Sequence, residues 1–98
     1  MHDRSDGLRL RVEEPLRCGP TDIEPGEYDV TVDDASSTIV LSRDGTEVLR
    51  ADALARATKA KVREPSARLR KVVDEPRRLL IARRPPSDEW VVSLDERA

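Results

Sequence analysis

The sequence predicts a small all-β fold, a barrel or a sandwich of six to seven short antiparallel strands. First, apolar and polar side chains alternate along several short segments, which puts one row of side chains inside and one row outside. Second, turn signals made of Pro, Gly and Asp separate these segments at fairly regular spacing. Third, the Pro25-Gly26 turn runs directly into an alternating strand in which Tyr28, Val30 and Val32 share one face.

The first half of the chain contains four predicted strands. An alternating segment begins the domain, and residues 16–21 are expected to be irregular because Gly19-Pro20 interrupts regular structure. The Asp44-Gly45 pair is the usual signal of a tight hairpin, so it predicts that the last two of these strands are antiparallel neighbours. The four strands are placed at residues 8–12, 27–32, 38–41 and 47–49.

Residues 51–62 allow two interpretations. Ala51, Ala53, Ala55 and Ala57 share one face with period two, which favours an extended strand whose inner side must be small. The same residues have high helix propensity, and Asp52 is a suitable N-cap, so a short helix at 52–61 stays open as the alternative. The extended strand is favoured because so short a helix is marginal unless its apolar face docks on the rest of the domain.

The second half of the chain ends the domain with a further hairpin and a closing strand. The hairpin joins 68–73 to 77–83 through Asp74-Glu75-Pro76, and the closing strand is placed at 89–94. We therefore expect one β domain at residues 8–94, with flexible flanks at 1–7 and 95–98.

Composition sets limits on the core and on the compartment. The chain has 98 residues, 39% of them charged, and its only aromatic side chains are Tyr28 and Trp90, so aliphatic residues must fill the core. Cys18 is the only cysteine, which excludes an intramolecular disulfide and favours a reducing compartment. Residues 1–7 carry no apolar segment, and we therefore expect a cytoplasmic protein without a signal peptide or a membrane span.

The order of turns and strands resembles a group of small bacterial β-domains of unassigned function. The resemblance rests on Pro25, Gly26, Glu27 and Tyr28, which match a Pro-Gly-x-Tyr strand start, followed by the Asp44-Gly45 hairpin and the alanine-rich segment. It implies a small barrel or sandwich and transfers no catalytic residue.

The residue types needed for common catalytic and metal sites are missing or scattered. His2 is the only histidine and lies in the expected flexible terminus, which argues against a histidine-based acid, base or ligand set. A zinc site built from several cysteines and histidines is excluded by count. The glycines are isolated in turns, and the paired carboxylates stand beside turns. The sequence therefore predicts a non-enzymatic domain without catalytic, cofactor or metal residues.

The charges are distributed unevenly along the chain. Residues 1–42 carry four basic and ten acidic side chains, whereas residues 50–84 carry twelve basic and four acidic ones. Two neighbouring sheets of opposite charge would account for this asymmetry, and so would an anionic partner. The alternative function is therefore binding of nucleic acid or another anionic partner by the basic belt at 50–84, although no aromatic residue lies within it to stack on bases. The candidate anion-binding residues are Arg56, Arg63, Arg68, Arg70, Arg77 and Arg78.

A run of apolar residues in the second half indicates a buried or contacted strand. Leu79, Leu80 and Ile81 are apolar on both faces of a strand, and Val91 stands beside Val92 in the same way. If the domain has a single core, one of these faces must contact another protein or a second copy. We therefore predict a protein-protein interaction or self-assembly module, a dimer included, with Leu79, Leu80, Ile81 and Val91 at the interface.

Overall fold

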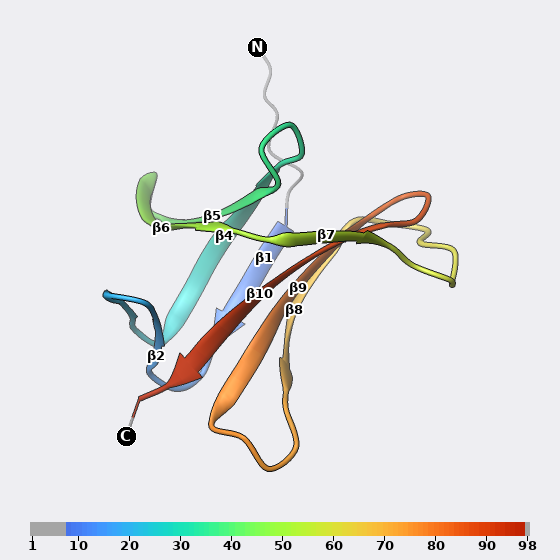
Figure 1. Cartoon of the computed structure of the whole chain (residues 1–98). Helices are drawn as coiled ribbons and strands as arrows, with labels where there is room; N and C mark the ends of the chain where they lie inside the picture. The colour runs from blue at the N-terminus through green and yellow to red at the C-terminus, as the bar shows by residue number, and fades with distance from the viewer. Residues whose placement is uncertain (1–7, 98) are drawn as a thin grey trace.

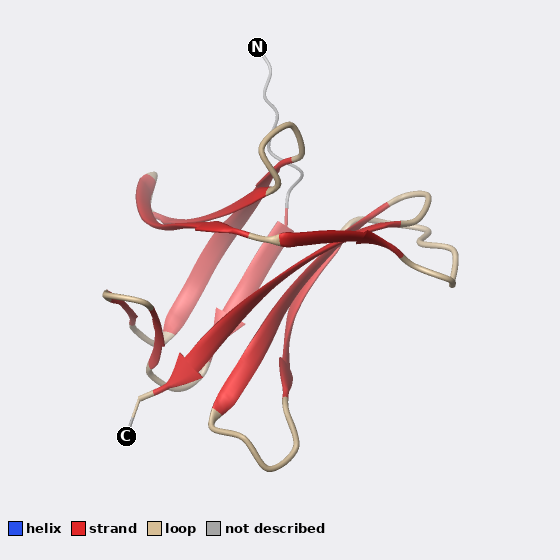
Figure 2. Cartoon of the chain, in the orientation of Figure 1, coloured by secondary structure: helices blue, strands red, loops and turns tan. Residues whose placement is uncertain are grey.

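The computed structural model describes residues 8–97, which form ten β-strands in two antiparallel sheets (Figures 1 and 2). The predicted all-β class is confirmed. The strands are β1 (Leu8–Val12), β2 (Leu16–Cys18), β3 (Thr21–Ile23), β4 (Gly26–Asp33), β5 (Thr38–Arg43), β6 (Thr46–Asp52), β7 (Leu54–Ala57), β8 (Ser66–Lys71), β9 (Arg77–Arg84) and β10 (Asp88–Glu96).

Each sheet is built mainly from one half of the chain. Sheet A has the order β1-β4-β5-β6, and sheet B has the order β3-β2-β10-β9-β8. Strand β10 is the centre of sheet B. It pairs with β9 on one edge, and its other edge is shared by β7, which pairs with residues 88–91, and by β2, which pairs with residues 95–96.

The segment at residues 51–62, for which the sequence allowed a strand or a helix, begins in extended form and joins the two sheets. Strand β6 ends at Asp52 in sheet A, and β7 begins at Leu54 and pairs with β10 in sheet B. The two strands thus form a nearly continuous extended segment that passes from one sheet to the other (Figure 1). The N–H of Ala53, at the junction, donates to the Ser37 carbonyl at 2.8 Å. The favoured strand is confirmed up to Ala57, whereas residues 58–62 are not in a strand. The alternative of a helix at 52–61 was wrong, because β7 pairs with β10 in extended form.

The number of strands and several boundaries differ from the sequence prediction: residues 8–97 form ten strands instead of six to seven, and β8 ends at Lys71 instead of at residue 73. Residues 16–21 were expected to be irregular, but β2 and β3 form a short hairpin around Gly19, whose φ of 58° suits glycine. Strand β10 continues to Glu96, where its last residues pair with Leu16 and Arg17, so a flexible flank at 95–98 was wrong for Asp95 and Glu96. The predicted flexible segment 1–7 lies outside the described residues.

The hydrophobic core lies between the sheets. Alternating residues of β1, β4 and β5 supply one side of it, and Leu80, Ala82, Trp90, Val92 and Leu94 supply the other. Within this core, the two aromatic rings each lie under an arginine, Tyr28 under Arg43 and Trp90 under Arg84.

The start of β4 explains why a glycine precedes the tyrosine. Gly26 has a φ of 149°, a conformation that L-residues rarely adopt, and a Cβ at this position would lie 2.8 Å from the Arg43 guanidinium. The glycine thus lets Arg43 reach the Tyr28 ring, while the Tyr28 hydroxyl donates to the Glu24 carbonyl.

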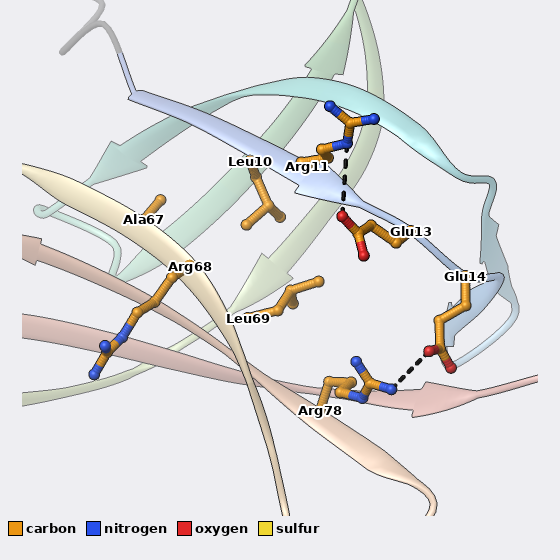
Figure 3. Close-up of a pocket in the computed structure, with 8 residues that line it drawn as sticks. All are labelled: Leu10, Arg11, Glu13, Glu14, Ala67, Arg68, Leu69 and Arg78. Carbon is orange, nitrogen blue, oxygen red and sulfur yellow. Dashed lines mark hydrogen bonds and ion pairs between the residues drawn. The ribbon is translucent and has the colours of Figure 1, made fainter.

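The two sheets do not close into a complete barrel. Strands β1 and β8 are the end strands of sheets A and B; they approach each other, yet no strand pairing joins them within the described residues. Figure 3 shows β8 beside β1, with Leu10, Ala67 and Leu69 between the two strands, and we call this place the seam.

Candidate interaction surface

The face of sheet B that points away from the core carries a row of apolar residues. In β9, Leu80 and Ala82 point into the core, so Leu79 and Ile81 take the outer face. Cross-strand pairing aligns Ile81 with Val91 of β10, and Val91 with Leu54 of β7. We call the outer residues Leu54, Leu79, Ile81 and Val91 the outer strip.

The members of the outer strip differ in exposure. Leu54 is 64% exposed, Leu79 and Val91 are half-buried, and Ile81 is only 2% exposed although it lies outside the core cluster. The prediction that Leu80 belongs to the interface was wrong, because this side chain is 0% exposed and lies in the core. The residue that sequence reasoning missed is Leu54, whose place beside Val91 depends on the crossing of β7 into sheet B.

A buried carboxylate lies beside one end of the outer strip. Glu89 is only 3% exposed, and its two carboxylate oxygens accept hydrogen bonds from Arg56 and from Arg83, the latter at 2.8 Å. Burial raises the pKa of Glu89, but the hydrogen bonds and the positive charges of the two arginines outweigh it and hold the pKa below its ordinary value. The carboxylate is therefore charged at neutral pH and fixes the two guanidinium groups.

The six candidate anion-binding residues do not form one cluster. Arg56 pairs with Glu89, Arg77 pairs with Glu75 at 2.7 Å, and Arg78 pairs with Glu14 at 2.8 Å and Glu96 at 2.9 Å. The other three, Arg63, Arg68 and Arg70, have no ion pair with any residue in the described part of the chain.

Only two of these unpaired arginines lie on the same strand. Arg68 and Arg70 are alternate residues of β8 on the outer face, and their cross-strand partners in β9 are Ile81 and Leu79. Arg63 lies in the connection before β8.

The charge asymmetry of the sequence corresponds to the two halves of the fold. Acidic residues of the first half lie in sheet A and in nearby loops, and arginines from the second half of the chain reach them. Arg78 contacts Glu14, Arg84 contacts Asp34 at 3.3 Å, and these pairs link sheet B to the first half of the chain. Only a small part of the asymmetry is thus balanced by ion pairs between the two segments in the described residues.

The seam holds a cavity of about 320 Å³. Leu10 of β1 and Ala67 and Leu69 of β8 project into the space between the two strands, whereas Arg68 points away from it (Figure 3). The charged side chains around its margin are Arg11, Glu13, Glu14, Arg68 and Arg78.

Most of the charges at the seam already have partners. Glu13 lies 3.7 Å from Arg11, and Glu14 lies 2.8 Å from Arg78. Arg68 is the exception, so the cation on the β8 side of the seam is not neutralised. Sequence reasoning identified Arg68 but missed the seam, since alternation shows which face a residue takes and does not show which strand ends a sheet.

The remaining chemistry-bearing residues do not form a second site. Tyr28 and Trp90 are buried in the core, so they are not available to stack on a ligand. Cys18 packs partly buried against the core, and burial, with a smaller effect of Asp95, raises the pKa of its thiol. In residues 8–97, no group of three or more histidine, cysteine or acidic side chains is placed to hold a metal ion. Nor does this part of the chain form a helix with the length and hydropathy needed to cross a bilayer.

Comparison with known protein families, with curated proteins and with solved structures gives no match for this chain. The resemblance to small bacterial β-domains accordingly stays a prediction from the Pro25–Tyr28 segment.

Proposed function

We propose that this chain is a non-catalytic interaction module that associates with a second copy of itself through the outer strip. The observation that carries the proposal is that exposed Leu54 and half-buried Val91 lie side by side on neighbouring strands, on the side of sheet B that faces away from the core, next to Ile81, which is itself only 2% exposed. Apolar residues of this size are usually isolated on a monomer surface, whereas a contiguous row of them is typical of a contact surface.

The surroundings of the outer strip support the same interpretation. Charged residues flank it on both sides, with the Arg56–Glu89–Arg83 group at one end and Arg68 and Arg70 along β8. An apolar centre with a polar margin is the usual composition of a protein interface. A second copy is the favoured partner because two-fold dimers that use the same patch on both subunits are the commonest soluble oligomers. A reducing compartment such as the cytoplasm is consistent with the single thiol of Cys18.

The test compares two exposed apolar residues of similar size. Leu54→Asp changes the outer strip, and Val73→Asp changes a residue that is 80% exposed in the β8–β9 turn and lies outside the strip. Light scattering after size exclusion, at several concentrations and two salt levels, gives the solution mass of the wild-type protein and of both variants.

We expect a dimer that resists salt in the wild-type protein and in Val73→Asp, and a monomer of unchanged circular dichroism in Leu54→Asp. A monomer of the wild-type protein at every concentration would contradict the proposal. A dimer that dissociates in salt, or that persists in Leu54→Asp, would also contradict it and would indicate contact between charged surfaces.

A further inference from the structure

The end strand β8 has an unused edge. It pairs with β9 on one side, and on the other side it faces the seam without pairing to β1. In an antiparallel end strand, alternate residues direct their N–H and C=O groups away from the single neighbour, so such an edge can pair with a further strand. No proline interrupts residues 66–71, so β8 can donate and accept along the part of this edge that β1 does not lie against.

The side chains of β8 specify what a neighbouring strand must carry. On the inner side, Ala67 and Leu69 border the seam cavity together with Leu10, so the inward residues of an added strand would be apolar. On the outer side, Arg68 and Arg70 lack ion pairs within the described residues, so the outward residues would be acidic. The required pattern is an alternation of apolar and acidic residues.

Strand β4 shows this pattern next to the opposite end strand. It pairs with β1, which alternates leucine or valine inward with Arg9 and Arg11 outward, just as β8 alternates apolar residues with arginines. The outward residues of β4 opposite these arginines are Glu27 and Asp29, and they contact Arg9 at 3.3 Å and 3.1 Å. The molecule thus already pairs one arginine-bearing strand with an acidic and apolar one.

We propose that the free edge of β8 binds an extended peptide segment of alternating apolar and acidic residues, which adds to sheet B as a further strand. Main-chain hydrogen bonds to β8 supply part of the affinity, apolar side chains enter the seam cavity, and carboxylates pair with Arg68 and Arg70. This proposal concerns a surface other than the outer strip and does not depend on self-association.

A second copy of β8 does not fit this edge. If two β8 strands paired about a two-fold axis, their arginines would lie opposite or diagonal to one another, and like charges in those positions destabilise a strand pair. Nucleic acid is the less favoured occupant, because Tyr28 and Trp90 are buried and no aromatic ring is available for stacking beside the arginines.

The test uses a fluorescent synthetic peptide of alternating valine and glutamate, and a control peptide of the same composition with the valines and glutamates in separate blocks. Binding to the wild-type protein is followed by fluorescence anisotropy, and hydrogen exchange measures the protection of the β8 amides. The charge-reversal variant is Arg68→Glu with Arg70→Glu. Its control is Arg63→Glu, which changes another arginine that has no ion pair in the described residues but lies outside β8.

We expect the alternating peptide to bind the wild-type protein and to protect the β8 amides, and the block peptide to bind at least about tenfold more weakly. The charge-reversal variant should lose the glutamate peptide and gain an alternating valine and lysine peptide, whereas Arg63→Glu should bind as the wild-type protein does. Leu54→Asp should also keep peptide binding, so this proposal and the proposed dimer fail separately.

Four results would overturn the proposal. Equal binding of the two glutamate peptides would show attraction by charge alone. Binding without protection of the β8 amides would exclude strand addition. No binding of either peptide would mean that Arg68 and Arg70 only keep the edge from pairing, and displacement of the alternating peptide by single-stranded DNA at lower concentration would identify nucleic acid as the better ligand.

Discussion

Glu89 shows how two arginines keep a carboxylate charged at a site that water barely reaches. Arg56 and Arg83 contact its carboxylate, and the Glu89 side chain is only 4% exposed. An unpaired charge in such a place is costly, so the group is stable only while both guanidinium partners stay in position.

The low pKa of Glu89 predicts a pH-dependent contribution to stability. Because its pKa is lower in the folded than in the unfolded chain, the carboxylate stabilises the fold above its ordinary pKa, and this contribution is lost as the pH falls through the folded value. We expect Glu89→Gln to lower the free energy of unfolding by about 1–3 kcal/mol at pH 7. Below about pH 4 the difference from the wild-type protein should shrink.

Urea unfolding at neutral and acidic pH checks this prediction. Arg17→Gln is a suitable control, since its pair with Asp22 at 3.0 Å lies at the surface, where ion pairs contribute at most about 1 kcal/mol. A difference between Glu89→Gln and the wild-type protein that is the same at both pH values would contradict the assigned pKa shift.

At the scale of elements, two successive residues of β9 lie on opposite faces of sheet B. Leu80 lies in the core, and Leu79 lies half-buried on the outer face beside Arg70 and Ser93. Both positions carry leucine on the same strand. A difference in stability between their alanine variants therefore reports the difference in burial alone.

Truncation of these two leucines should give unequal effects. We expect Leu80→Ala to lower the free energy of unfolding by about 2–5 kcal/mol, because it leaves a cavity in a close-packed core. Leu79→Ala should lower it by about 1 kcal/mol, because the half-buried side chain loses less contact. Chemical unfolding followed by circular dichroism measures both values, and equal losses would contradict the assignment of Leu80 to the core.

The strands that were predicted correctly are those whose inner and outer rows differ sharply. Alternation placed β1, β4 and β10, and the Asp44-Gly45 signal placed the β5–β6 hairpin. The β2–β3 hairpin escaped prediction because three-residue strands are too short for a periodic signal, and pairing with the end of β10 is what holds them extended. The seam was not predicted because two end strands meet there without pairing. Only the strand order of both sheets shows that β1 and β8 are end strands.

At the scale of the whole molecule, three of the eight strand pairs in the described residues, β1 with β4 and β10 with β2 and β7, connect distant parts of the chain. Strand β10 pairs with β2, the β1 end of sheet A lies against β8, and the core cannot form until these contacts are made. Loop closure of this kind has an entropic cost before the contacts stabilise the fold, and for this reason β proteins of high contact order fold slowly.

We therefore expect refolding on the order of milliseconds to seconds. Trp90 is the only tryptophan and is buried in the core, so its fluorescence in a stopped-flow experiment reports core formation directly. The Leu54→Asp variant removes the proposed association from the measurement. A refolding time in microseconds would contradict the non-local topology.

The position of β10 in sheet B also has a consequence for synthesis on the ribosome. Strands β2, β7 and β9 all pair with β10, but β10 is the last of the described strands to leave the exit tunnel. Sheet A can assemble while the chain is still being translated, but its inner row of leucines and valines must wait for the sheet that covers it. During that interval we expect the outward acidic residues of β4 and the outward arginines of β1 to limit pairing between nascent chains on the same message.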